Sequence, residues 1–382
     1  MRRGLIAAAI AVLASAAVVT AAVAKTSEPA GLAKADCTSS TLGFMGPLTG
    51  PAGFLGQEQL SWLRFGVLRY NTASGTKFKV APGDTQLKSP VALTVGRKFA
   101  ADDNIWAIIG VSESQGNVVT GNLFEKNDLV MVSGSATRTT LTTPGRPYKT
   151  FFRVVPNDSI QGPTIVKYVS GNLKAKNVVV IDSQDDYSVP LAQGVTRGLR
   201  ARGAKVARES VSADDTDFSS IVANVESNVT VVVFATQVAS AANTLSNQLR
   251  EQGKKAIVFG TDGAYSPSQF KPKSGYVSVF GPDLHFDPAA RKLVREYNTY
   301  SKNRPFGSFG PATYMAGLVA MTAITKACAD GEADRAEITK AVGGTNIPSI
   351  IGKNITFTRS GDVKGVDFLI YRVTNGKYSP VG

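Results

Sequence analysis

Histidine is nearly absent from this 382-residue sequence, which contains only His285, in the Pro-flanked stretch GPDLHFDP. A protein zinc site needs a cluster of Cys, His or carboxylate ligands, and one histidine with two distant cysteines does not supply it. No GxGxxG or GxxxxGKS/T phosphate-binding motif follows an apolar strand. We therefore expect no metal site and no cofactor.

Clustered basic charge is also missing. The chain has 42 Lys and Arg residues against 29 Asp and Glu residues, a formal net charge of +13. These basic residues are scattered and do not form the aromatic-interleaved stripe that is typical of nucleic-acid binding. The charge predicts a solvated basic surface and no nucleic-acid partner.

The N-terminus has the pattern of a secretory signal peptide over residues 1–24. Arg2 and Arg3 precede an apolar run that ends in Ala22-Val23-Ala24, a small-x-small cleavage site. An uncleaved anchor is the alternative, since the run is long enough to span a bilayer. We expect cleavage, a flexible leader over residues 25–39, and a mature chain in the periplasm or cell-envelope space. We expect no later segment to be both apolar and long enough to span.

The two cysteines are Cys37 and Cys328. An exported chain with an even number of cysteines predicts a disulfide between them. The alternative is two buried free thiols.

From Ser40 onward, short apolar strands alternate with amphipathic helices. TLGFMG, IWAIIG and LVMVS are strands of the first half, and NVVVIDS, VTVVVFATQ and AIVFGTDG are strands of the second. This alternation predicts an α/β fold with two Rossmann-like lobes, each a parallel sheet covered by helices, joined by a multi-crossover hinge. We expect lobe 1 to comprise residues 40–156 and 283–352, and lobe 2 to comprise 157–282 and 353–382.

An exported hydrolase is the alternative from another functional class. GVSES, Gly110 to Ser114, is similar to a nucleophile elbow but lacks its second glycine, and His285 is the chain's only histidine base. Acids at strand ends could converge, although such residues are more often caps or ligand anchors. They are Glu113, Asp182, Asp185, Asp186 and Asp262.

Ligand binding accounts better for the strand-end residues, because open α/β sheets bind ligands beyond the carboxyl ends of their strands. Helix N-termini at that edge suit a carboxylate or a phosphate. Lobe 1 offers hydroxyls there, and lobe 2 offers an acid and an aromatic ring. The candidates are Ser112, Ser114, Ser133, Ser135, Ala136 and Thr137 in lobe 1, and Asp182 to Tyr187, Thr236, Gln237 and Asp262 in lobe 2. Such a pair of surfaces matches a zwitterion at both ends.

An ordered series of segments resembles the leucine/isoleucine/valine-binding family of periplasmic solute-binding proteins. The segments include GFMGPLTGPAGFLGQE, IIGVSESQGNVVTGNLFEKNDLVMVSGSATRTTLT and GDVKG. The resemblance implies the type I periplasmic binding protein fold and no enzymatic activity. It also implies a monomeric receptor that presents an amino acid, aliphatic or branched, to the permease of an ABC importer. The alternative within the fold is a receptor for an amide, urea or an aromatic acid.

The resemblance also assigns the two charged ends of the ligand. Ser114, Thr137 and the Ser135–Ala136 backbone fall where the family binds the α-carboxylate and offers a carbonyl to the ammonium. Asp262 falls where the family places an acid, more often Glu, against the α-ammonium. Helix capping is the other reading for the Ser and Thr residues, and a turn is the other reading for Asp262.

Aromatic and amide positions complete the implied site. Tyr187 matches an aromatic wall from lobe 2, Phe54 matches a ring that closes the side-chain pocket from lobe 1, and Gln237 stands where some members have Tyr. Phe309 and Tyr314 are candidates to reach the cleft from the returning C-terminal segment.

Two charges beside the hydroxyl cluster qualify this assignment. If the Glu113 side chain points inward, its negative charge repels a ligand carboxylate and the assignment of the cradle is in doubt. If it faces solvent, the assignment is unaffected. We expect Arg138 to be a surface charge, with a carboxylate clamp as the alternative.

Overall fold

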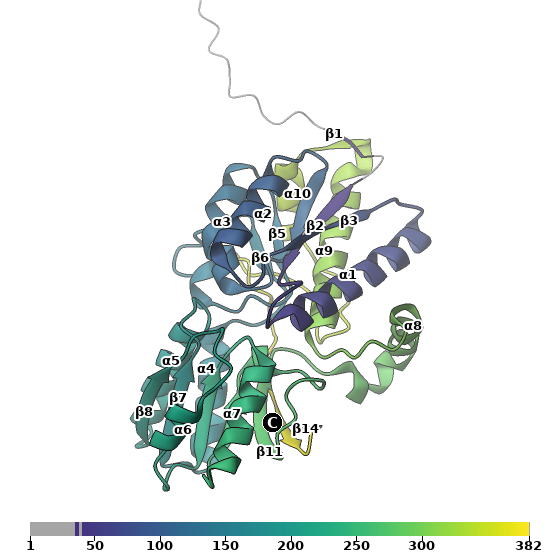
Figure 1. The fold of residues 1–382 in the computed structure, drawn as a ribbon. Helices are drawn as coiled ribbons and strands as arrows, with labels where there is room; N and C mark the ends of the chain where they lie inside the picture. Colours follow the sequence, from purple (N-terminus) through teal and green to yellow (C-terminus); the bar gives the residue numbers. More distant parts are fainter. Residues whose placement is uncertain (1–34, 38–39, 382) are drawn as a thin grey trace, which may run out of the picture. The chain divides into compact units, whose positions relative to one another are not determined.

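The computed structural model describes residues 35–37 and 40–381 (Figure 1). The predicted signal peptide, residues 1–24, and most of the predicted leader lie outside the described residues.

Lobe 1 is built on a parallel five-stranded sheet in the order β3-β2-β4-β5-β6. Every residue of the central strand β4 is buried, because helices cover both faces of the sheet. Helices α2 and α3 pack together, as do α1 and α9, and Figure 1 shows all four around the sheet. The strands are β2 (Thr41–Gly46), β3 (Lys79–Asp84), β4 (Ile105–Ile109), β5 (Met131–Ser133) and β6 (Phe151–Arg153), and the helices are α1 (Gly53–Ser74), α2 (Ser89–Ala100), α3 (Ser114–Lys126), α9 (Phe309–Ala327) and α10 (Arg335–Gly343).

Lobe 2 has a seven-stranded sheet in the order β14-β13-β11-β10-β9-β7-β8. Strands β7 to β11 are parallel, and the hairpin β13-β14 adds an antiparallel edge. Asn375 and Gly376 close that hairpin with φ angles of 49° and 73°, the left-handed pair that a type I′ turn requires. The strands are β7 (Asn177–Asp182), β8 (Lys205–Ser210), β9 (Val231–Ala235), β10 (Ile257–Gly260), β11 (Ser274–Val279), β13 (Leu369–Thr374) and β14 (Lys377–Pro380), and the helices are α4 (Asp158–Lys167), α5 (Ser188–Ala201), α6 (Ser219–Asn224) and α7 (Ala239–Glu251).

The predicted fold class, two α/β lobes with parallel sheets, is confirmed. Within the described residues the chain passes between the two sheets three times: from β6 to α4, from β11 to α9, and from α10 to β13. Helix α8 (Arg291–Ser301) lies in the second crossover. In the third, Asp362 bridges to Arg153 and Phe357 packs on Phe152 at 5.1 Å between ring centroids. The boundary that we propose between lobe 1 and lobe 2 at residue 353 therefore falls within the third crossover segment, which still contacts lobe 1 after this residue.

A disulfide joins Cys37 to Cys328, 291 residues apart. Beside it, β1 (Ala35–Asp36) pairs with β12 (Glu332–Ala333). Residues 35–37 belong to the segment that we expected to be a flexible leader, yet they are held to the end of α9 by these contacts.

The expectation that no later segment could span a membrane by length and composition is wrong for α9. An 18-residue stretch within Phe309–Asp330 has a mean hydropathy of 1.2, but 61% of that stretch is buried inside the fold. The helix packs against α1, β4 and β5. Its apolar composition is that of a core helix that is surrounded on most sides.

Candidate functional site

A cavity of about 20 Å³ lies between the lobes, beyond the carboxyl ends of their strands. Pro47, Ser112 and Ser135 follow β2, β4 and β5 of lobe 1, while Gln237 and Asp262 follow β9 and β10 of lobe 2. This is the edge at which open α/β sheets bind ligands. The residues that line the cavity are Pro47, Leu55, Gln59, Leu87, Ser112, Glu113, Ser114, Ser135, Tyr187, Gln237, Asp262, Gly263 and Phe309.

The lobe 1 wall contains a hydrogen-bonded ring of three residues. Ser112 Oγ donates to Gln59 Oε1 at 2.6 Å, and Gln59 Nε2 donates to Ser135 Oγ at 2.8 Å. Ser135 Oγ in turn donates to the Ser112 carbonyl at 2.7 Å. The two serines were sequence candidates, whereas Gln59 was missed because it lies inside α1, far along the chain from any strand end.

Ser114 is the first residue of α3, so the free N–H groups of that helix start beside the cavity. The Ser114 Oγ accepts the backbone N–H of Arg138 at 3.3 Å. Thr137 is buried, and its hydroxyl makes no hydrogen bond of normal geometry among the described residues, although it is near enough to the Asp158 carboxylate to lower the pKa of that group. A helix N-terminus with two hydroxyls close by can bind an anion.

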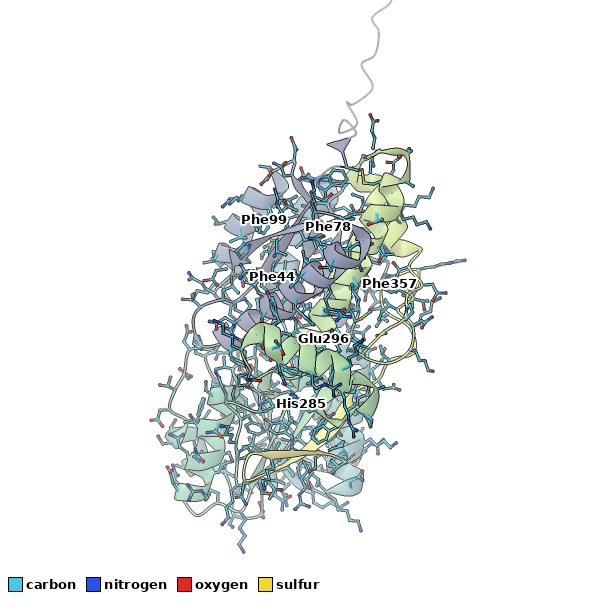
Figure 2. All side chains as sticks on the ribbon, turned by 90° about the vertical axis from the view of Figure 1, so that its right-hand side faces the viewer. Phe44, Phe78, Phe99, His285, Glu296 and Phe357 are labelled. Carbon is cyan, nitrogen blue, oxygen red and sulfur yellow. A yellow bond between two sulfur atoms is a disulfide. The ribbon has the colours of Figure 1, made fainter. Side chains whose placement is uncertain are left out.

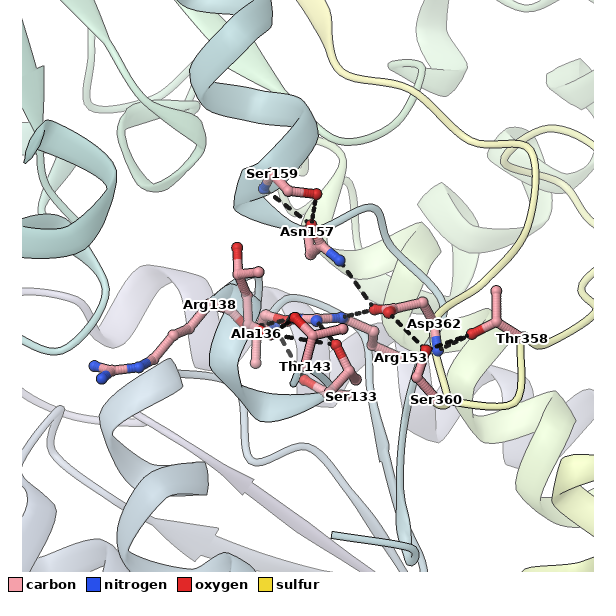
Figure 3. Close-up of polar contacts among 12 residues, drawn as sticks. Ser133, Ala136, Arg138, Thr143, Arg153, Asn157, Ser159, Thr358, Ser360 and Asp362 are labelled. Atoms are coloured by element: carbon pink, nitrogen blue, oxygen red, sulfur yellow. Dashed lines mark hydrogen bonds and ion pairs between the residues drawn. The ribbon is translucent and has the colours of Figure 1, made fainter. Parts of the chain in front are cut away.

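The Ala136 carbonyl is already used within the protein. Arg153, fully buried, donates from Nη1 to the carbonyls of Ala136 at 3.0 Å and Arg138 at 2.8 Å, and from Nε to Asp362 at 2.6 Å (Figure 3). Burial raises the pKa of Asp362, but the neighbouring guanidinium outweighs that effect and holds it below its usual range. One lone pair of the Ala136 carbonyl is therefore taken by Arg153, and the other is left for a ligand donor; the assignment of this carbonyl to a ligand ammonium stays a prediction.

Asp262 supplies a buried carboxylate from lobe 2. Its Oδ1 accepts hydrogen bonds from the Tyr187 hydroxyl and from Gln161 Nε2, the latter at 2.7 Å. Burial raises the pKa of Asp262 to about 6 even though these donors lower it. Gln161 lies inside α4, and nothing in its local sequence marked it as part of the site.

A second carboxylate, that of Asp158, lies near Asp262 and was not a sequence candidate. Burial and the charge of Asp262 raise its pKa to about 7, whereas Thr137 lowers it. Neither carboxylate oxygen has a hydrogen bond of normal geometry among the described residues. Asp158 starts α4, directly after β6 at the same sheet edge, which is the signal that could have identified it.

Two polar contacts join the lobes beside the cavity. Gln237 Nε2 lies 3.2 Å from Gln115 Oε1 of α3. Arg138 Nη1 lies 2.6 Å from both the carbonyl oxygen and Oδ1 of Asp186. Arg138, which we expected to be a plain surface charge, thus spans the two lobes, because α5 brings the 182–187 loop up to it.

Several other candidates lie elsewhere. Phe54 is half-buried and does not line the cavity; Leu55 and Gln59 do, since residues four apart share one face of a helix. Tyr314 packs against Trp62 in the lobe 1 core, with ring centroids 5.9 Å apart. Phe309, in contrast, lines the cavity.

His285, labelled in Figure 2, lies between β11 and α8 in the chain. It is not among the residues that line the cavity. Its Nδ1 is 2.6 Å from Asp283 Oδ1, and its ring stacks on Phe306 at 4.3 Å between centroids. The hydrogen bond to Asp283 raises its pKa. The serines of the cavity therefore have no histidine base beside them.

Comparison with known proteins gives one consistent answer. The family model described as "Periplasmic binding protein" matches residues 39–377. The Leucine-, isoleucine-, valine-, threonine-, and alanine-binding protein of Pseudomonas aeruginosa is 25% identical over 352 residues, covering 90% of this chain and 92% of that protein.

Solved structures share the fold. A leucine binding protein, LivK, from Thermotoga maritima MSB8 has a TM-score of 0.81 at 23% identity and covers 90% of this chain and 98% of its own. A solute binding protein from R. palustris in complex with benzoate has a TM-score of 0.79 at 15% identity and covers 90% and 96%. The resemblance seen in the sequence is confirmed. This chain belongs to the periplasmic binding protein family, whose members are substrate-binding proteins and not enzymes.

Proposed function

We propose that this chain is the extracytoplasmic substrate-binding protein of an ABC importer and that it binds an α-amino acid between its lobes. One observation carries the proposal: Ser114, at the start of α3, and Asp262, in the opposite lobe, line the same cavity. A zwitterion placed between them pairs a carboxylate with helix N–H groups and an ammonium with a carboxylate.

The charges of the site support this orientation. Asp262 is buried and its pKa is raised, as is expected of a buried carboxylate that has no cation beside it. A buried charge is tolerated when it is paired and hydrogen-bonded, and an α-ammonium supplies both the charge and the donors.

Contacts from both lobes link binding to closure. A ligand that touches Ser114 and Asp262 together stabilises the closed form, because only there are both contacts made. Arg138–Asp186 and Gln115–Gln237 add direct contacts between lobes in that form. A cavity of about 20 Å³ has room for little more than a water molecule, so the lobes must separate to admit the ligand. We propose that the permease recognises the closed form.

The relatives bear on ligand class and location. The P. aeruginosa relative is named for binding leucine, isoleucine, valine, threonine and alanine, which supports the predicted aliphatic or branched class. We also propose cleavage after the predicted signal peptide, export to the periplasm or cell-envelope space, and a monomeric receptor.

An aromatic acid is the second candidate ligand, on one observation. The R. palustris structure holds benzoate, and Tyr187 and Phe309 place two rings at this cavity. The buried carboxylate of Asp262 opposes it, because an aromatic acid brings no cation.

Thermal-shift measurement on refolded, ligand-free protein tests the proposal. The panel consists of the twenty amino acids together with acetamide, urea and benzoate, which represent the alternative ligand classes. We expect at least one amino acid to raise the melting temperature, since ligand at 100 times Kd stabilises by about 2.7 kcal/mol. A rise with an amide or benzoate, and with no amino acid, would contradict it.

A further inference from the structure

Glu113 is a buried carboxylate in the cavity wall that the proposed function leaves unused. Its relative exposure is 2%, and it lines the cavity between Ser112 and Ser114. Neither carboxylate oxygen has a hydrogen bond of normal geometry among the described residues. The Thr85 hydroxyl is near enough to lower its pKa but also lacks such a bond.

No cation offsets this charge within the described chain. Burial and the nearby acid Asp84 raise the pKa of Glu113 to about 7. The two arginines of the neighbouring loops are engaged elsewhere, Arg138 with Asp186 and Arg153 with Asp362. Leaving a buried carboxylate unpaired costs several kcal/mol.

Helix capping does not account for Glu113. It occupies the N-cap position of α3, yet its side chain accepts no hydrogen bond from the first turn. A Cβ at Gly116 would stand 2.8 Å from Glu113 Oε1, so glycine leaves space for the carboxylate over that turn. Glu113 therefore occupies the N-cap position without making the hydrogen bonds that a capping side chain provides.

The cavity wall around Glu113 combines polar and apolar side chains. Ser112, Gln59 and Ser135 form the hydrogen-bonded ring described above, and Leu55 and Leu87 lie among the other lining residues. An aliphatic ligand side chain would leave the buried Glu113 carboxylate without a hydrogen-bond donor.

We propose that the ligand is an amino acid whose side chain carries a hydrogen-bond donor, an ammonium or an amide N–H, and that Glu113 accepts it. This inference rests on the proposed function, the binding of an α-amino acid between the lobes, and it replaces the aliphatic or branched class of ligand by amino acids with a side-chain donor. Glu113 then sets specificity, while Ser114 and Asp262 hold the α-carboxylate and α-ammonium.

Calorimetric titration with two pairs of equal-sized ligands tests the inference. L-asparagine matches L-leucine in shape, and L-ornithine matches L-norleucine; only the first of each pair has a side-chain donor. We expect wild-type protein to bind asparagine at least tenfold more tightly than leucine, or ornithine at least tenfold more tightly than norleucine. A preference in the first pair identifies an amide donor, and a preference in the second pair identifies an ammonium.

Two variants extend the test. Glu113→Leu should remove the preference, and Glu113→Gln, which keeps size and an acceptor, should weaken ornithine more than asparagine. Glu251→Gln, at an exposed position, is the matched control and should keep the wild-type ratio. Because the wild-type ratio is itself a result, misfolding of a variant leaves the test intact.

The outcomes separate the inference from the proposed function. If leucine and norleucine bind at least as tightly as their partners, Glu113 does not select a donor and only the inference is overturned. If no amino acid of the thermal-shift panel binds, the proposed function fails and the inference fails with it.

Discussion

The guanidinium of Arg138 in lobe 1 contacts Asp186 in lobe 2, with Nη1 2.6 Å from both the carboxylate and the backbone carbonyl. The backbone N–H of the same arginine donates to Ser114 Oγ. One residue therefore connects the proposed carboxylate end of the cavity to the contact between the lobes. Both side chains are partly exposed, 23% and 40%, so the contact adjusts closure and does not dominate it.

Asp186→Ala should weaken ligand binding by about two- to fivefold, in line with up to about 1 kcal/mol for an exposed ion pair. Calorimetry measures the affinity, and small-angle scattering measures the radius of gyration with and without ligand. Asp214→Ala, an exposed acid in the same lobe, is the control. Wild-type affinity and an unchanged ligand-free radius in Asp186→Ala would refute a role of this pair in closure.

Ligand affinity should depend on the protonation of Asp262. Its pKa is raised to about 6 by burial, and that of the neighbouring Asp158 to about 7 by burial and by Asp262. An ammonium binds the ionised form, so affinity should fall by about tenfold between pH 7 and pH 5 as the binding-competent fraction shrinks. Calorimetry in buffers of matched ionic strength checks this. Affinity that is flat or rises on acidification would exclude Asp262 as the ammonium partner.

Stability should show the opposite pH trend through Glu58. This residue is buried, and its Oε1 accepts the Gly310 N–H at the start of α9 at 2.7 Å. Burial raises its pKa from 4.5 to about 7. An acid with a raised folded-state pKa stabilises fully below its unfolded-state value, and this contribution is lost as the pH rises toward 7.

Glu58→Gln keeps an acceptor and removes the charge. Between pH 4.5 and pH 8 the free energy of unfolding of wild type should therefore fall by about 3 kcal/mol more than that of Glu58→Gln. Urea denaturation at both pH values gives the difference, with Glu251→Gln as the exposed control. Parallel pH profiles for wild type and Glu58→Gln would contradict the burial argument.

The disulfide should contribute to stability because it closes a loop of 291 residues in the unfolded chain. Replacing both Cys37 and Cys328 by serine should lower the free energy of unfolding by about 2–5 kcal/mol with little change in ligand affinity, since neither lines the cavity. Denaturation with and without reductant measures the loss. A reductant-insensitive wild type that matches the double variant would argue against the bridge.

Short apolar runs in the sequence were enough to predict both sheets, because their central strands are continuous apolar segments such as IWAII and VVVFA. The short helix α10 and the strand β11 were missed: α10 has nine residues, and β11, SGYVSV, begins with small polar residues. Their structure depends on partners distant in sequence, α9 and the hairpin β13-β14.

The site was predictable where a residue directly follows a strand. Ser112, Ser114, Ser135, Gln237 and Asp262 follow β4, β5, β9 and β10, and all line the cavity. Gln59 and Gln161 lie inside helices, and packing alone brings them to the site. Whether Glu113 faces solvent or the interior depends on the loop around Thr85 and on Gly116, which its own neighbours in sequence do not reveal.

The most direct test of the account is calorimetric titration of an amino acid identified by thermal shift into wild type, Asp262→Asn and the exposed control Asp214→Asn. Asp262→Asn is nearly isosteric but removes the charge that an α-ammonium needs. The account predicts wild-type affinity in the control and at least a 30-fold loss in Asp262→Asn, with the deaminated ligand binding both proteins equally weakly. Equal affinity of wild type and Asp262→Asn for the amino acid would contradict the account.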